Sequence, residues 1–172
     1  MIEENKKVCF LTWNEVSVAL HISALRHTES IRQKLKDNHG YTGRDIHDNF
    51  YGVLGEMAFA KISNQYFPMT VNNFKDADIG NQWQVRTVGS NKNRNLIVRY
   101  ADPNTHFYAL IEVQKCLTWA RDEDTYKATF RGWIKGKDAK QARYLTDFGY
   151  KDRPKVFSVP FSELKPTSWY PI

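Results

Sequence analysis

The sequence of residues 76–87 is Asp76-Ala77-Asp78-Ile79-Gly80-Asn81-Gln82-Trp83-Gln84-Val85-Arg86-Thr87, and it predicts a short acidic turn followed by a strand. Successive side chains of a strand point to opposite faces, so Gln84 and Arg86 share one face of this strand. Trp83 and Val85 then lie on the other face. The stretch therefore places an acid, Asp78, just ahead of a polar residue, one spacer and a cation.

Such an arrangement suits phosphodiester chemistry. The acid can hold a divalent metal, the polar residue can extend the metal site or orient water, and the cation can face the scissile phosphate. The same residues also fit an ordinary polar hairpin with one solvated strand face, and short motifs of this kind produce many false matches. These residues alone leave both interpretations open.

Composition and charge limit the class of protein. The 172 residues suit one domain with a proper core, and 41% hydrophobic and 14% aromatic residues are typical of a globular chain. The formal net charge is +6 and the isoelectric point is near 9.3. An excess of positive charge favours a polyanionic partner such as nucleic acid, although a merely basic protein has the same composition.

The two cysteines, Cys9 and Cys116, have no other cysteine or histidine at the spacing of a zinc site. We therefore expect reduced thiols in a cytoplasmic protein. Charged residues follow Met1, so no secretory signal fits. No apolar run approaches the roughly 20 residues that cross a bilayer, and we expect no membrane partner.

Two helices are predicted in the first part of the chain. Residues 11–37 begin with the capping-box pattern Thr12-Trp13-Asn14-Glu15 and continue with apolar residues at helical spacing. Arg26 is assigned to the surface of this helix, where it is solvated or touches phosphates. The second helix covers residues 44–66. Its glycines, Gly52 and Gly55, suggest a close approach of the backbone to a sheet or a ligand.

Glu56 lies among small and apolar residues of the second helix. A carboxylate in such surroundings is partly buried, and a buried charge needs a partner or a metal. Either a metal ion or a nearby arginine or lysine would satisfy it.

The second part of the chain predicts a run of strands with turns between them. We expect strands at residues 69–73, 82–88, 96–100, 106–113, 125–134 and 156–159, a short helix at 138–144, and a short turn or helix at 161–164. Helices followed by strands predict an α+β fold, with N-terminal helices (about 11–66) packed on one face of a mixed β-sheet (about 69–164). The whole chain, 1–172, is expected to form a single domain.

Three segments together resemble the active-site pattern of the PD-(D/E)XK nuclease superfamily. They are Gly55-Glu56-Met57-Ala58-Phe59-Ala60-Lys61, Asp78-Ile79-Gly80 and Gln82-Trp83-Gln84-Val85-Arg86-Thr87. In that superfamily a helix contributes a glutamate, a turn after the first core strand an aspartate, and the second core strand (D/E)-x-K. The resemblance covers about residues 44–113 and implies a restriction-endonuclease-like core. The layout is also similar to uncharacterised phage proteins, which would place this protein in the host cell cytoplasm.

The sequence departs from the superfamily pattern at two positions. Gln84 stands where the second acid is expected, and its carbonyl oxygen can ligate a hard cation without adding negative charge. Arg86 stands in place of the lysine. An arginine keeps a permanent cation for the phosphate but cannot act as a general base at ordinary pH.

The resemblance implies a metal-dependent nuclease that hydrolyses phosphodiester bonds, in DNA. Glu56, Asp78, Gln84 and Arg86 would form the catalytic site, with Asp76 as a substitute for Asp78. Mg²⁺ or Mn²⁺ would be held by Glu56, Asp78 and the Val85 carbonyl. The nucleic-acid backbone would be seated by cations that are equally compatible with ordinary surface charges: Lys61, Lys92, Arg94 and Arg99. The alternative is a catalytically inactive nuclease-like fold that acts as a phage DNA-binding or host-protein-binding module.

Overall fold

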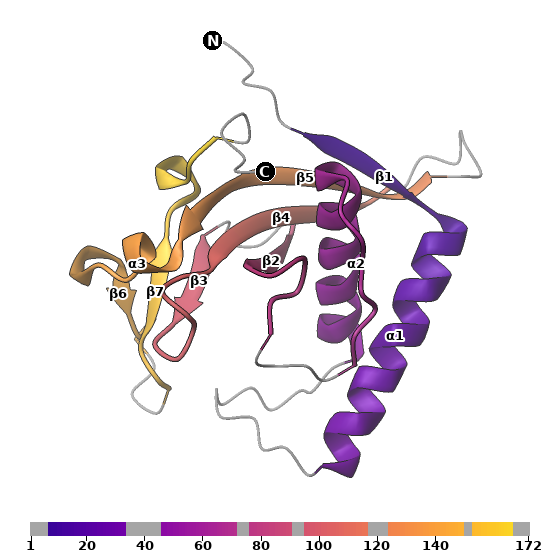
Figure 1. Ribbon diagram of the computed structural model, residues 1–172, viewed down its shortest axis with the longest axis horizontal. Helices are drawn as coiled ribbons and strands as arrows, with labels where there is room; N and C mark the ends of the chain where they lie inside the picture. Colours follow the sequence, from indigo (N-terminus) through magenta and orange to yellow (C-terminus); the bar gives the residue numbers. More distant parts are fainter. Residues whose placement is uncertain are drawn as a thin grey trace.

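Two long, curved strands form the middle of the computed structural model (Figure 1). The structure describes residues 7–33, 46–71, 76–90, 95–116, 124–149 and 153–166. Its elements are β1 (Val8–Thr12), α1 (Trp13–Arg32), α2 (Ile46–Ser63), β2 (Trp83–Gly89), β3 (Leu96–Arg99), β4 (Phe107–Lys115), β5 (Asp124–Lys135), α3 (Gly136–Ala139), β6 (Leu145–Thr146) and β7 (Val156–Val159), with short 3-10 turns at Ala142–Tyr144 and Phe161–Glu163. Strands β4 and β5 are the two long ones.

The strands form two sheets. The larger sheet has the order β1-β5-β4-β2, in which β2 runs parallel to β4 and the other neighbours are antiparallel. The smaller sheet, β3-β7-β6, is antiparallel. The expected α+β class with a mixed sheet is confirmed. Strand β2 lies at the end of the larger sheet, so one of its edges has no neighbouring strand.

Strand β4 is buried on both faces, as its apolar sequence predicts. Ala109 and Ile111 pack in the core beneath α2, together with Val85 of β2. Tyr108 and Leu110 point the other way and pack with the smaller sheet. The two hydrophobic cores therefore meet on opposite sides of one strand.

Helix α2 covers the larger sheet, and α1 packs chiefly on α2 rather than on the sheet itself (Figure 1). The close approach that the glycines predict is present at Gly55, where an added Cβ would overlap the Thr87 side chain of β2. At Gly52 an added Cβ would meet no atom within 4 Å. Helix-on-sheet packing therefore requires a glycine at Gly55 but not at Gly52.

The first helix begins at the predicted cap. The Thr12 hydroxyl accepts from Glu15 N–H at 3.3 Å, and the Glu15 carboxylate accepts from Thr12 N–H at 2.7 Å. Its buried face consists of small and branched residues, namely Val16, Ala19, Ile22 and Ser23. Trp13 and Leu20 are exposed, because α1 rests on α2 along a face that is rotated from the most apolar one.

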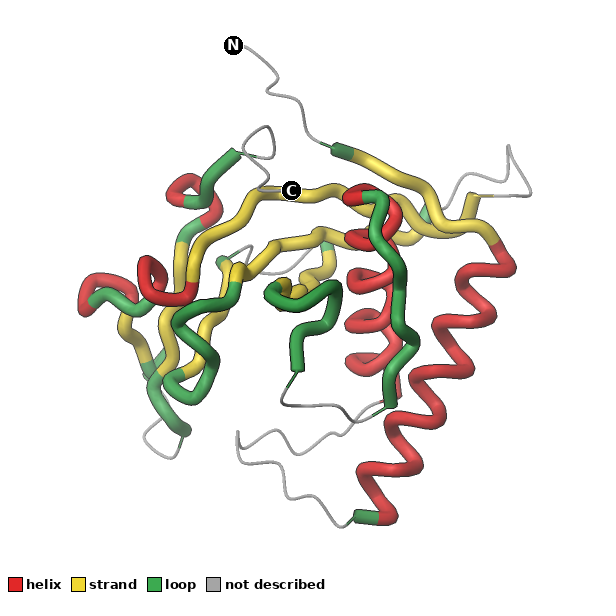
Figure 2. The backbone as a smooth tube through the Cα atoms, in the orientation of Figure 1, coloured by secondary structure: helices red, strands yellow, loops and turns green. Residues whose placement is uncertain are grey.

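Other sequence predictions were wrong in detail. Strand β1, which pairs with β5, was missed because residues 11 and 12 were assigned to the helix. No strand forms at residues 69–71, and the rest of the predicted strand at 69–73 lies outside the described residues. Met69 has φ 51°, which interrupts an extended backbone. Figure 2 shows the chain running back beside α2 as a loop at this point. The helix predicted at 138–144 is replaced by α3 and a 3-10 turn.

Candidate active site

The acidic turn folds back onto the free edge of β2. Trp83 N–H donates to the Ile79 carbonyl at 3.3 Å, and the Trp83 carbonyl accepts from Asp78 N–H at 2.8 Å. Gly80 completes the turn with φ 58°, a left-handed conformation that glycine adopts without strain. These backbone contacts hold Asp78 beside the strand that carries Gln84 and Arg86.

Asp78 is anchored to the edge of β2 by its own side chain. Its Oδ2 accepts a hydrogen bond from Val85 N–H at 2.7 Å. The N–H and the C=O of one residue in a strand point in the same direction, so the Val85 carbonyl also opens toward this edge. A carboxylate and a main-chain carbonyl are thus placed side by side, as the resemblance requires.

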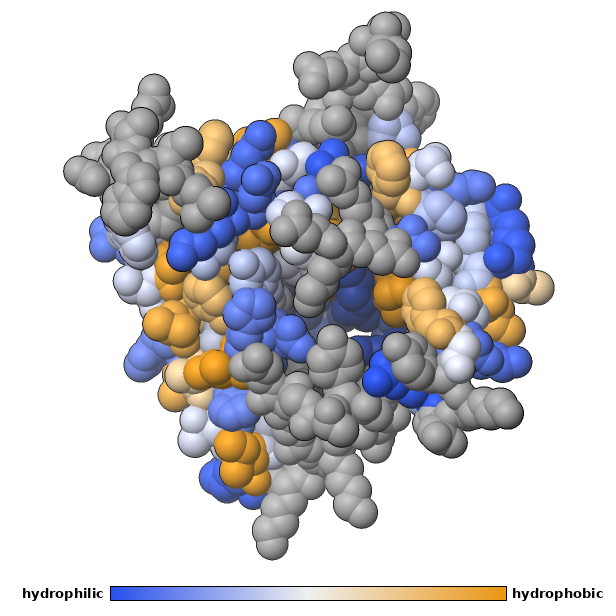
Figure 3. Space-filling view, turned by 180° about the vertical axis from the view of Figure 1, so that it is seen from behind, coloured by the Kyte–Doolittle hydropathy of each residue, from blue (hydrophilic) through white to orange (hydrophobic). Residues whose placement is uncertain are grey.

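A cavity of about 230 Å³ brings the predicted site residues together. Its lining includes Glu56 from α2, Asp78 from the turn, and Gln84 and Arg86 from β2. It also includes further charged residues that the sequence did not assign to the site: Arg26 and Asp102. The view from behind shows a hollow near the middle of the molecule, with hydrophilic side chains around it (Figure 3).

Glu56 is paired with an arginine. Arg26 donates from both terminal nitrogens to the two carboxylate oxygens, each at 2.8 Å, and its Nε donates to the Thr70 carbonyl at 2.9 Å. The side chains are only 18% and 11% exposed. Assignment of Arg26 to a solvated or phosphate-contacting surface was therefore wrong. Arg26 instead pairs with Glu56. A nearby arginine or lysine was one of the two expected ways to satisfy this buried carboxylate.

The surroundings of Asp78 disfavour the ionised form of its carboxyl group. Burial, and then the nearby charge of Glu56, raise the pKa of Asp78 from 3.8 to about 6. The Val85 N–H, Arg86 and Arg26 act in the opposite direction, but they do not outweigh those causes. A bound cation between the two carboxylates would relieve the same repulsion.

Arg86 is held by three hydrogen bonds. It donates from Nη2 to Asp102 Oδ2 at 2.8 Å, from Nε to the Ile97 carbonyl at 3.2 Å, and from Nη1 to Gln84 Oε1 at 3.4 Å. The guanidinium carbon also lies 5.4 Å from the centre of the Tyr108 ring. The cation on β2 is thus fixed by β3 and by the turn that follows it.

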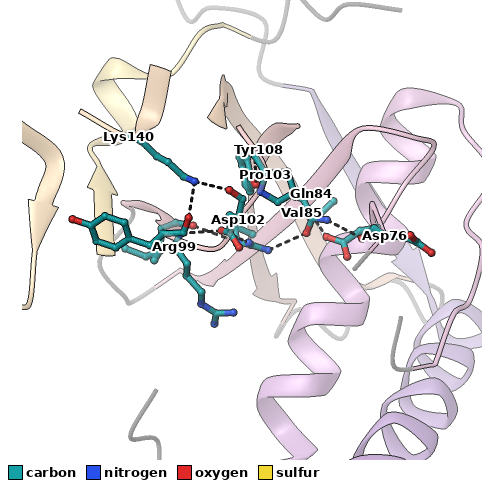
Figure 4. Close-up of polar contacts among 12 residues, drawn as sticks. Asp76, Gln84, Val85, Arg99, Asp102, Pro103, Tyr108 and Lys140 are labelled. Carbon is teal, nitrogen blue, oxygen red and sulfur yellow. Dashed lines mark hydrogen bonds and ion pairs between the residues drawn. The ribbon is translucent and has the colours of Figure 1, made fainter. Parts of the chain in front are cut away.

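Asp102 is the residue that ties this part of the site together. Its Oδ2 accepts from Arg99 N–H at 2.9 Å as well as from Arg86. Lys140 donates to the Asp102 carbonyl at 2.5 Å (Figure 4) and to the Tyr100 carbonyl at 2.8 Å, and these two bonds secure the turn. In the sequence, Asp102 falls between the predicted strands at 96–100 and 106–113, where only a turn was expected.

Gln84 faces Arg86 rather than Asp78. Its Nε2 donates to the Asp76 carbonyl at 2.9 Å, and its Oε1 accepts from Arg86. The oxygen that could ligate a cation is therefore already used as an acceptor. Asp76 lines the same cavity, next to the turn that carries Asp78.

Of the four cations predicted to seat nucleic acid, Lys61 and Arg99 lie in the described part of the chain. Lys61 lies in the last turn of α2, where it pairs with Glu15 at 2.8 Å and donates to the Phe10 carbonyl at 3.0 Å. It does not line the cavity, whereas Arg99 does. Lys92 and Arg94 fall outside the described residues.

The predicted metal ligands are all oxygen atoms. Glu56, Asp78 and the Val85 carbonyl supply oxygen atoms of the kind that Mg²⁺ and Mn²⁺ prefer. Within the described residues, no group of three or more histidine, cysteine, aspartate or glutamate side chains could hold a metal ion. Any ion here would also have to share Glu56 with Arg26.

Comparison of the chain with protein-family models, with curated proteins and with solved structures found no match. The likeness to the nuclease superfamily therefore depends on the site residues themselves. No helix in the described part of the chain is long and apolar enough to span a bilayer.

Proposed function

We propose that this protein is a metal-dependent nuclease that hydrolyses phosphodiester bonds in DNA, built on a restriction-endonuclease-like core. One observation carries the proposal. Glu56, Asp78, Gln84 and Arg86 come from a helix, a turn and a strand, and they line the same cavity. Two carboxylates beside a fixed cation are what a site needs to act on a phosphodiester.

Glu56, Asp78 and the Val85 carbonyl would hold Mg²⁺ or Mn²⁺, which would polarise the phosphate and lower the pKa of bound water. Arg86 binds the phosphate oxygens and stabilises the negative charge that develops on them. Its hydrogen bonds to Asp102 and the Ile97 carbonyl fix the guanidinium before substrate arrives. Gln84 orients Arg86 from the same strand face.

A cleavage assay tests this function on plasmid, linear duplex and single-stranded DNA, each with Mg²⁺, with Mn²⁺ and with EDTA. We expect metal-dependent cutting by the wild type and its loss in Asp78→Asn and Glu56→Gln. The matched control is Glu163→Gln, because Glu163 lies outside the cavity in a pair with Arg143. If the Asp78→Asn variant still cuts DNA, then this site, or this protein, is not responsible for the cleavage.

The second candidate is a nuclease-like fold that binds DNA or a host protein without cutting. The pairing of Glu56 with Arg26 favours it, because a cation already occupies both oxygens of the carboxylate that the metal needs. The neutral Gln84 favours it too. In the same assay this protein would bind DNA in EDTA and leave every substrate intact with either metal.

A further inference from the structure

A second and larger hollow opens beside the active-site cavity. It has a volume of about 1060 Å³ and is lined by the start of α2, by β2, by the end of β4 and by Phe148 after β6. Arg86 lines both this groove and the smaller cavity. A ligand that fills the groove therefore reaches the cation that we assign to the phosphate.

One part of the groove wall is aromatic and comes from the first turns of α2. The rings of His47 and Tyr51 lie 4.6 Å apart between centroids, with 37° between their planes. Next to them is Gly52, where an added Cβ would meet no atom within 4 Å. The glycine leaves space beside the stacked rings, and packing against the sheet does not account for it.

Phe148 adds a second aromatic side chain from a different element. Its side chain is half exposed, and its backbone has φ 54°, a conformation that is unusual for a bulky residue. The Thr146 hydroxyl accepts from Phe148 N–H at 3.0 Å, and the Asp147 carboxylate accepts from Gly149 N–H at 2.9 Å. The turn thus holds an apolar ring in the groove at a conformational cost.

The charges in the groove complement an anion. Arg86 and Lys115 line it, against one carboxylate, Asp48. The amide side chain of Gln114 also lines the groove, whereas Asn95 Nδ2 already donates to the Ser158 hydroxyl at 2.9 Å. Aromatic faces combined with cations bind single-stranded nucleic acids, in which unpaired bases stack on rings while cations follow the phosphates.

We propose that this groove binds unpaired nucleotides of a DNA strand and leads that strand to Arg86. The delivery of the strand to Arg86 rests on the proposed nuclease function, whereas the binding of unpaired nucleotides in the groove does not. A duplex cannot use these rings, because its base faces are stacked inside the helix.

Fluorescence anisotropy with a labelled oligothymidylate in EDTA tests the binding step without cleavage. We expect Phe148→Ala to weaken binding by about tenfold or more, in line with the loss of one stacked base. Phe161→Ala is the matched control, because Phe161 is equally exposed and lines neither hollow. His47→Ala, from the other part of the wall, should weaken binding as well. A blunt duplex of two fully paired strands should bind less tightly than the single strand.

The outcomes separate this proposal from the nuclease function. Single-strand binding that falls in Phe148→Ala supports the groove, even if no substrate is ever cut. Equal losses in Phe148→Ala and Phe161→Ala, or tighter binding of the blunt duplex, overturn it even if the protein cuts DNA. A groove that takes an extended peptide would bind no oligonucleotide, and that result also overturns the proposal.

Discussion

Arg26 of α1 binds both carboxylate oxygens of Glu56 of α2, and this pair connects the outer helix to the active-site cavity. We expect Arg26→Met to destabilise the protein by about 3 kcal/mol, because it leaves a mostly buried carboxylate without its partner. Urea unfolding measures the change. Arg32→Met is the control, since Arg32 is exposed on the same helix and pairs with Glu29 there. Equal destabilisation by both variants would contradict a special role for Arg26.

The same pair should weaken metal binding. Arg26 competes with a cation for Glu56, so Arg26→Gln should bind Mn²⁺ more tightly than the wild type. Gln84→Glu should also tighten binding, because added ligand charge raises affinity for hard cations. Calorimetric titration with Mn²⁺ measures both effects, and Asp78→Asn should abolish the signal. Tight binding that survives Asp78→Asn would place the ion elsewhere.

Arg86 and Asp102 should affect cleavage to different degrees. Removal of one contact that stabilises developing charge lowers the rate by about 10²–10³, so we expect Arg86→Ala to lose most activity and Arg86→Lys to keep much of it. Asp102→Asn weakens the anchor of Arg86 but leaves the cation in place, so it should lower kcat less, with recovery in Asp102→Glu. If the wild type is silent, the double variant Gln84→Glu and Arg86→Lys tests whether a degenerate site can be restored. Unchanged activity in Arg86→Ala would remove this residue from the mechanism.

Gly52 and Gly55 offer a matched pair on one helix. Gly55→Ala should destabilise the protein by about 1–3 kcal/mol, because the new Cβ overlaps Thr87. Gly52→Ala should be neutral or stabilise by up to about 1 kcal/mol, since the position is open and alanine favours a helix. Thermal unfolding of both variants distinguishes the two positions. Similar effects at both would mean that α2 does not approach β2 as described.

Asp78 should make metal-free stability depend on pH. Its pKa is raised from 3.8 to about 6, so the folded protein binds this proton more strongly than the unfolded chain does. The stability from that proton is fully present below about pH 4 and is lost as the pH rises through 6. Asp78→Asn lacks the proton equilibrium, so its stability relative to the wild type should increase across that range. Urea midpoints in EDTA at several pH values measure the difference, and a pH-independent difference would contradict it.

The parts of the fold that the sequence predicted are those with a strong local signal. The capping box at Thr12 and Glu15, the alternation of Gln84 and Arg86, and the apolar run of β4 each depend on neighbouring residues. Strand β1 was missed because its pairing partner, β5, lies more than a hundred positions away in the chain. The sequence did not identify the buried face of α1, because packing on α2, rather than apolar content, selects it.

The candidate site shows the same division. Glu56 and Asp78 could be found from the motif, since acids in apolar or turn segments are conspicuous. Arg26 and Asp102 could not, because each resembles an ordinary surface or turn residue until the chain folds. A weak signal did exist for Arg26, since a buried Glu56 requires a positive partner. Nothing in the sequence indicated which of the 25 lysines and arginines would supply it.

The contact between Lys140 and the turn at Asp102 limits how far this site can be separated from the rest of the chain. A fragment that ends with β5 would retain Glu56, Asp78, Gln84 and Arg86. It would lack Lys140 and also β7, which pairs with β3 and so supports the Ile97 carbonyl. The last part of the chain contributes no residue to the proposed chemistry, but its contacts hold the groups that align Arg86.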